Sequence, residues 1–91
     1  MAYVVAIHDI RDPEKFWGAA DQAAEFPAGI TLHGSYPNED GSHAVCLWEA
    51  DSADAVRELV DGAVGDSSQN QFFEVNSQHS GTRGLPTAAR A

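Results

Sequence analysis

The chain has 91 residues, of which 43% are hydrophobic and 21% are charged. This length fits one domain, and the balance of residue types excludes an intrinsically disordered chain as the main interpretation. Fourteen acidic residues against five basic ones give a formal charge of −9. Such a surface repels phosphate groups, so we expect neither a nucleic acid nor a membrane as a partner.

Features that would place the chain outside the cytoplasm are missing from the sequence. No apolar run approaches the ~20 residues of a membrane span. The first ten residues, MAYVVAIHDI, lack the basic segment and the cleavage site of a signal peptide. A single cysteine excludes an internal disulfide and fits a reducing compartment. We therefore expect a cytoplasmic protein.

The first half of the chain predicts a strand, a helix and a β-hairpin. Residues 3–8 form a short apolar segment that is rich in β-branched side chains, as in a central strand. Asp12 and Pro13 are typical of a helix start, and apolar spacing extends this helix to about Phe26. Residues 30–36 and 43–50 alternate on either side of Asp40-Gly41, which indicates a hairpin.

The second half adds one helix and one strand. Asp51 or Ser52 caps a helix that ends at Gly62 or Gly65, and residues 66–70 form a polar loop before a strand over 71–76. The order βαββαβ predicts an α+β, ferredoxin-like domain over residues 1–78, with both helices on one face of a four-stranded antiparallel sheet. Residues 79–91 are small and polar, and we expect a tail without a core.

The alternation in the hairpin assigns side chains to the two faces of the sheet. An even loop length places Leu32 with Val45 and Leu47, and we expect this set under the helices. A four-residue loop puts His33 across from Cys46, whereas a two-residue turn puts Ser35 there and His33 across from Trp48. The predicted helix-free face carries Val4, Ala6, His8, Thr31, His33, Ser35, Ala44, Cys46, Trp48, Phe72, Glu74 and Asn76.

That predicted face is too apolar for water, and a chain of this size cannot cover it alone. We therefore expect a homodimer in which two sheets face each other. Such a pair forms a dimeric α/β barrel with a semi-polar interior.

The hairpin and the last strand also resemble a known family. The segments that carry the resemblance are Leu32-His33-x-Ser35-Tyr36, Val45-Cys46-Leu47 with Glu49-Ala50, and Phe73-Glu74-Val75. They are similar to a family of small nickel-binding dimeric α/β-barrel proteins, over roughly residues 30–76. The resemblance implies a ferredoxin-like dimer in which His33, Cys46 and Glu74 lie near a metal or near the barrel centre.

Three functions remain open at this point. The first is a metal-binding protein that holds Ni, Zn or Cu with His33, Cys46, Glu74 and a possible fourth ligand, His8, a mixture of donors that suits these ions. The second is a cofactor-free enzyme, of the cyclase, isomerase or monooxygenase type, in which His33 is the general acid or base. Its pocket for a hydrophobic or aromatic ligand would be lined by Trp48, Phe72, Ser35 and Thr31. The third is a structural dimer with a filled barrel.

Overall fold

The computed structural model describes residues 1–22, 26–76 and 78. The six elements, in chain order, are β1 (Ala2–Ile10), α1 (Pro13–Gln22), β2 (Thr31–Pro37), β3 (His43–Ala50), α2 (Ala53–Val64) and β4 (Ser68–Glu74). The strands form one antiparallel sheet in the order β2-β3-β1-β4. This is the ferredoxin-like arrangement, so the predicted fold class is confirmed for the protomer. The predicted tail, residues 79–91, lies outside the described residues.

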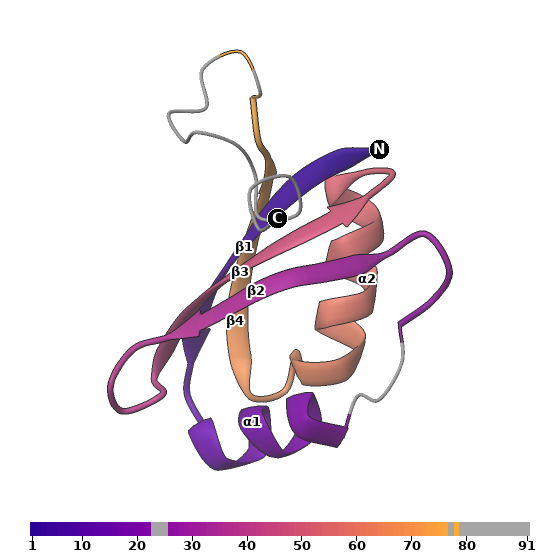
Figure 1. The fold of residues 1–91 in the computed structure, drawn as a ribbon. Coiled ribbons are helices and arrows are strands. Elements are labelled where there is room, and N and C mark those ends of the chain that lie inside the picture. The colour runs from indigo at the N-terminus through magenta and orange to yellow at the C-terminus, as the bar shows by residue number, and fades with distance from the viewer. Residues whose placement is uncertain (23–25, 77, 79–91) are drawn as a thin grey trace.

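Both helices lie on the same side of the sheet (Figure 1). The side chain of Asp12 accepts a hydrogen bond from the backbone N–H of Lys15 at 3.1 Å, and that of Ser52 accepts one from Ala55 at 3.2 Å. These contacts satisfy N–H groups at the helix starts, as the sequence predicts. The described part of the first helix runs to Gln22 and Phe26 is not helical, while residues 23–25 of the predicted helix lie outside the described residues.

The hairpin between β2 and β3 is tied to α1. Gly41 has a φ of +77°, a conformation that favours glycine, and the indole N–H of Trp17 donates to its carbonyl at 3.0 Å. Ser35 pairs with Cys46, as the two-residue-turn register predicts. Further along, the register shifts between Leu32 and Gly34, so His33 is the extra residue of a β-bulge. Leu32, rather than His33, therefore pairs with Trp48.

The face assignment from the sequence is wrong for most of the sheet. The core beneath the helices contains Val4, Ala6, Ile10, Phe16, Ala44, Cys46, Trp48, Ala50, Val56, Val60 and Val64. Most of the strand residues in this core are the ones predicted for the helix-free face. The physical reason is size: small side chains on the sheet leave room for Phe16 and for three valines of α2. The bulkier set on the same strands lies on the other face.

The last strand begins earlier than predicted. Ser68 and Asn70, expected in a loop, pair with Ile10 and His8 of β1. Their polar side chains point inward, where hydrogen bonds satisfy them: the single hydrogen of the Ser68 hydroxyl is shared between the Val64 carbonyl oxygen at 3.1 Å and the Asn70 side-chain oxygen at 2.9 Å. Hydropathy alone does not detect a strand whose inward side chains are polar.

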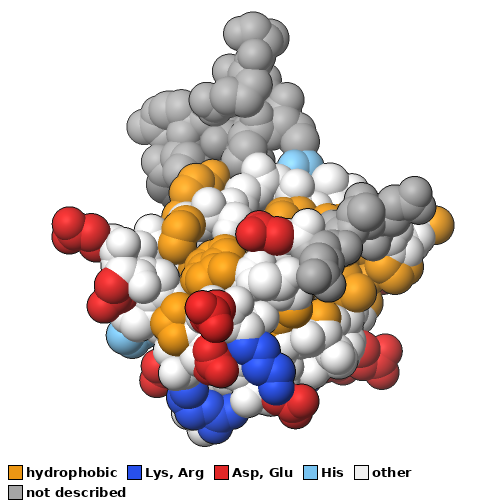
Figure 2. All heavy atoms as spheres, turned by 90° about the horizontal axis from the view of Figure 1, so that it is seen from below, with side chains coloured by type: hydrophobic (Ala, Val, Ile, Leu, Met, Phe, Trp, Pro, Cys, Tyr) orange, Lys and Arg blue, Asp and Glu red, His pale blue; other side chains and the backbone are white. Residues whose placement is uncertain are grey.

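The surface of the described residues carries both acidic and hydrophobic side chains. Acidic side chains are scattered over the face seen in Figure 2, with hydrophobic side chains between them. Neither helix in the described part of the chain is long and apolar enough to cross a membrane.

Candidate functional site

A partly enclosed cavity of about 140 Å³ lies between the two helices and the sheet. Its walls are mainly apolar, and they include five residues with polar side-chain atoms, which are His8, Trp17, Ser35, Cys46 and Trp48. The volume is close to that of cavities, roughly 150 Å³, that accept benzene in other proteins. This cavity therefore fits a molecule with about one ring.

The most unusual residue of the wall is His8 on β1. Its side chain is 2% exposed. Its Nδ1 lies 2.6 Å from the side-chain oxygen of Asn70 on β4, and its ring packs against Phe16 with the centroids 5.3 Å apart. Because an amide oxygen only accepts, Nδ1 carries the hydrogen, and Nε2 keeps a free lone pair. The hydrogen bond found for the His8 side chain among the described residues is this one, through Nδ1.

The surroundings of His8 favour a neutral ring. Burial lowers the pKa of His8 below its ordinary value of 6.5. The hydrogen bond to Asn70 and the charge of Asp61 act in the opposite direction, but more weakly. A neutral imidazole with a free lone pair in an apolar cavity has the properties of a general base.

Cys46 is a buried thiol in the same wall. It donates a hydrogen bond to the Ser35 hydroxyl over 3.5 Å, and burial raises the pKa of the thiol. A raised pKa disfavours the thiolate that nucleophilic catalysis requires. Cys46 therefore shapes the cavity but is not an activated nucleophile.

Trp48 provides a hydrogen-bond donor without a partner. Its side chain is 5% exposed, and its ring meets the ring of Phe26 edge-on with the centroids 5.2 Å apart. Within residues 1–22, 26–76 and 78, nothing accepts a hydrogen bond from its buried indole N–H. A buried donor of this kind is uncommon, because leaving it unpaired costs about 1–3 kcal/mol.

The predicted metal ligands do not come together. His8 and Cys46 line the cavity, whereas His33 lies on the opposite face of the sheet. Glu74 is exposed, and its carboxylate lies 3.4 Å from the backbone N–H of Ala53, where it accepts a hydrogen bond at the start of α2. No group of three or more His, Cys, Asp or Glu side chains is placed to share an ion in the described ranges. Metal binding stays a prediction, but these four residues do not form one site within the protomer.

The predicted ligand-binding residues are also divided between the two faces. Trp48 and Ser35 line the cavity under the helices, because the face predicted to be helix-free is the one that the helices cover. Phe72 packs against the core beneath α2, where the guanidinium of Arg57 lies 5.4 Å from its ring centroid. Thr31 is exposed and pairs with Glu49, so it lies on the helix-free face as predicted.

His33 is the one predicted site histidine that lies on the helix-free face. The bulge turns it toward Glu49, whose carboxylate oxygen lies 2.9 Å from Nε2, and its ring lies 5.4 Å from that of Tyr3. The His33 side chain is 7% exposed, and that of Glu49 is 29% exposed. Besides His8 and Asn70 in the cavity wall, His33 and Glu49 thus form a polar pair outside the cavity, with the geometry of an acid–base dyad.

The helix-free face is apolar around this pair. Large side chains on it are substantially exposed, namely Ile7 at 39%, Val45 at 42% and Phe73 at 50%. Its two histidines lie next to carboxylates, since His43 is 3.7 Å from Asp9 and His33 contacts Glu49. The face is therefore apolar because of Ile7, Val45 and Phe73, which are not the residues predicted for it.

Asn70, the hydrogen-bond partner of His8, is a residue of the candidate site that the sequence analysis did not predict. It lies in the segment predicted as a loop, and nothing in its immediate neighbours marks it. The detectable signal is the pairing of the first and last strands, which brings position 70 opposite His8.

Comparisons of this chain with protein-family models, with curated proteins and with solved structures found no match. The resemblance to nickel-binding barrel proteins therefore stays a prediction.

Proposed function

We propose that the protein binds a small one-ring molecule in the cavity between helices and sheet, with His8 as a general base toward it. The observation that carries this proposal is the 2.6 Å hydrogen bond from His8 to Asn70, which leaves Nε2 free in an apolar wall. The proposal gives the acid–base role to His8 in place of His33, the residue expected from the sequence. The class of function remains the cofactor-free alternative derived from the sequence.

The chemistry follows from the neutral imidazole of His8 in the cavity wall. A ligand hydroxyl, or an activated C–H next to a carbonyl, would give its proton to Nε2. The resulting imidazolium keeps its Nδ1–H bonded to Asn70, and its positive charge stabilises the negative charge left on the ligand. Phenols and enols of one ring have the right size and polarity.

Binding can be tested with phenol and with toluene, which has a similar shape but no hydroxyl. We expect phenol to bind more tightly than toluene, by up to about tenfold, because one hydrogen bond contributes about 0.5–1.5 kcal/mol. Titrations followed by the NMR shifts of the Trp48 indole would give both dissociation constants.

His8→Leu should remove the preference for phenol and keep the binding of toluene. His43→Gln is the matched control, since His43 is exposed and far from the cavity wall, and it should change neither constant. The proposal fails if neither probe shifts the Trp48 resonance, or if His8→Leu still prefers phenol.

The proposal includes a homodimer formed through the helix-free face. The exposed large apolar side chains of this face support a second copy as the occupant. Such an apolar face suits contact with an identical face despite the overall charge of −9. Two sheets that pack this way form the α/β barrel expected from the sequence.

A further inference from the structure

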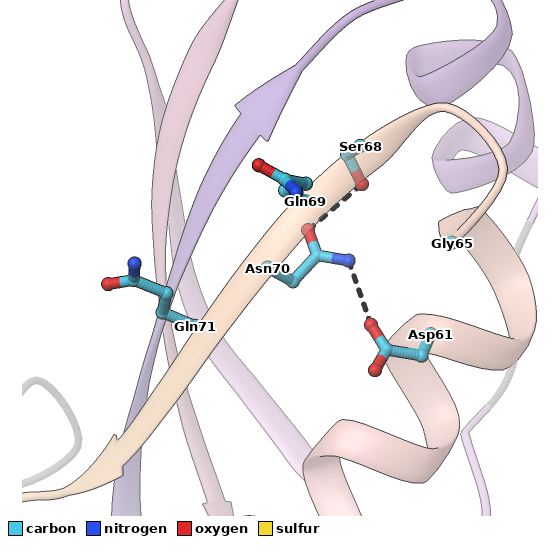
Figure 3. A pocket seen from close by; sticks show the side chains of 6 residues that line it. All are labelled: Asp61, Gly65, Ser68, Gln69, Asn70 and Gln71. Atoms are coloured by element: carbon cyan, nitrogen blue, oxygen red, sulfur yellow. Dashed lines mark hydrogen bonds between the residues drawn. The ribbon is translucent and has the colours of Figure 1, made fainter.

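The side chain of Asn70 has hydrogen bonds at both ends. Its oxygen accepts from the Ser68 hydroxyl at 2.9 Å and from His8 at 2.6 Å. Its Nδ2 donates to a carboxylate oxygen of Asp61 on α2, also at 2.9 Å. Figure 3 shows Asn70 between Ser68 and Asp61, in the hollow between β4 and α2. The chain His8–Asn70–Asp61 therefore connects the internal cavity with the surface.

The orientation of the Asn70 side-chain amide determines which ring nitrogen of His8 carries the hydrogen. With the oxygen toward the ring, Nδ1 carries the hydrogen and Nε2 is a base. With the NH₂ group toward the ring, Nδ1 would accept, the hydrogen would move to Nε2, and the cavity would face a donor. An amide has almost the same shape in both orientations, so only its hydrogen-bond partners distinguish them.

Among the three partners, Asp61 alone accepts without being able to donate as a carboxylate. The Ser68 hydroxyl donates or accepts by rotating, and the imidazole does so by changing its tautomer. The carboxylate of Asp61 requires an N–H from Asn70. This requirement turns the amide oxygen toward His8.

We propose that Asp61, an exposed residue of α2, is a positioning residue that fixes the tautomer of the buried His8 through Asn70. The inference rests on the proposed function, because the free lone pair of Nε2 is what the cavity uses there. The tautomer itself belongs to the ligand-free protein and is measured without any ligand.

The test compares three variants by the ¹⁵N shifts of the His8 ring in NMR spectra. Spectra are recorded at about pH 8, where an ordinary imidazole is neutral. In the unmodified protein we expect the pattern of protonated Nδ1 and unprotonated Nε2. Asp61→Asn keeps the shape but gives the position a donor, so both amides are free to turn. We expect the ratio of the two His8 tautomers to fall by roughly tenfold, because a charge-assisted hydrogen bond favours one orientation.

Asp61→Glu restores a carboxylate and should restore the original ratio. Glu58→Gln is the control, because it removes the same charge from an exposed position of the same helix without touching Asn70. Retention of the original tautomer in Asp61→Asn would overturn the proposal. It would also be overturned if Asp61→Glu and Asp61→Asn changed the ratio equally.

The tautomer measurement and the phenol titration can fail independently of each other. If the tautomer depends on Asp61 but phenol does not bind, the positioning role holds and the proposed function fails. If phenol binds through His8 and the tautomer ignores Asp61, the positioning role fails and the proposed function holds.

Discussion

The two faces of the sheet carry apolar side chains in different ways. Under the helices the strands contribute mainly small residues, together with Trp48 and the polar His8. On the other face they contribute Ile7, Val45 and Phe73, which are larger and partly exposed. The first face is completed by helices of the same chain, whereas the second has no covering element among the described residues. Residue size, rather than hydropathy alone, separates an internal packing surface from an external one.

Substitutions on the two faces should differ most in their effect on the free energy of unfolding. Trp48→Ala removes a buried ring, and we expect it to lower the free energy of unfolding by about 3–5 kcal/mol at any protein concentration. Phe73→Ala removes a ring that is buried only in the proposed dimer, so its effect should grow with protein concentration. Urea unfolding at two concentrations checks both. Equal, concentration-independent losses would contradict the difference between the faces.

The next prediction concerns association. Val45→Lys places a charge in the middle of the helix-free face, and we expect it to weaken the dimer by at least ~100-fold, because a charge buried in an interface must lose its water. Sedimentation velocity should show a dimer for the unmodified protein and a monomer for the variant, with unchanged circular dichroism. Glu58→Lys, on an exposed part of α2, is the control and should remain dimeric. A monomer in both the unmodified protein and the variant would refute the dimer.

The smallest expected effect is a dependence of stability on pH through His8. Burial holds its pKa in the folded state below 6.5, so the unfolded chain takes up a proton first as the pH falls. The contribution of neutral His8 is fully present above pH 6.5. It is lost as the pH falls from there toward the folded-state pKa, by at most ~1.4 kcal/mol per pH unit.

Urea unfolding between about pH 7.5 and 5 measures this dependence, before most carboxylates titrate. His8→Leu should flatten the profile relative to the unmodified protein, and His43→Gln should not. Parallel profiles for the unmodified protein and His8→Leu would show that His8 is not held neutral by burial.

The element order was predictable from the sequence because local signals mark it. Asp12 and Ser52 cap their helices, and Asp40-Gly41 lies between two alternating segments. The grouping of residues on β1 and β3 was also predictable, since alternation holds along both strands. The identity of the face under the helices was not, because both sets are apolar and the decisive volume comes from Phe16 and from α2.

The candidate site was less predictable than the fold. A one-residue bulge at His33 leaves the composition of the strand unchanged but reverses the alternation beyond it. The partner of His8 lies 62 positions away along the chain, in a segment without an apolar pattern. Only the pairing of β1 with β4 brings His8 and Asn70 together.

The bulge at His33 also has a consequence for solubility. β2 is an outer strand of the sheet, and a regular outer strand offers N–H and C=O groups on which strands of other molecules can add. An extra residue interrupts the spacing of those groups and bends the strand, so a straight incoming strand matches only part of it. The bulge that places His33 next to Glu49 thereby also protects this edge against aggregation.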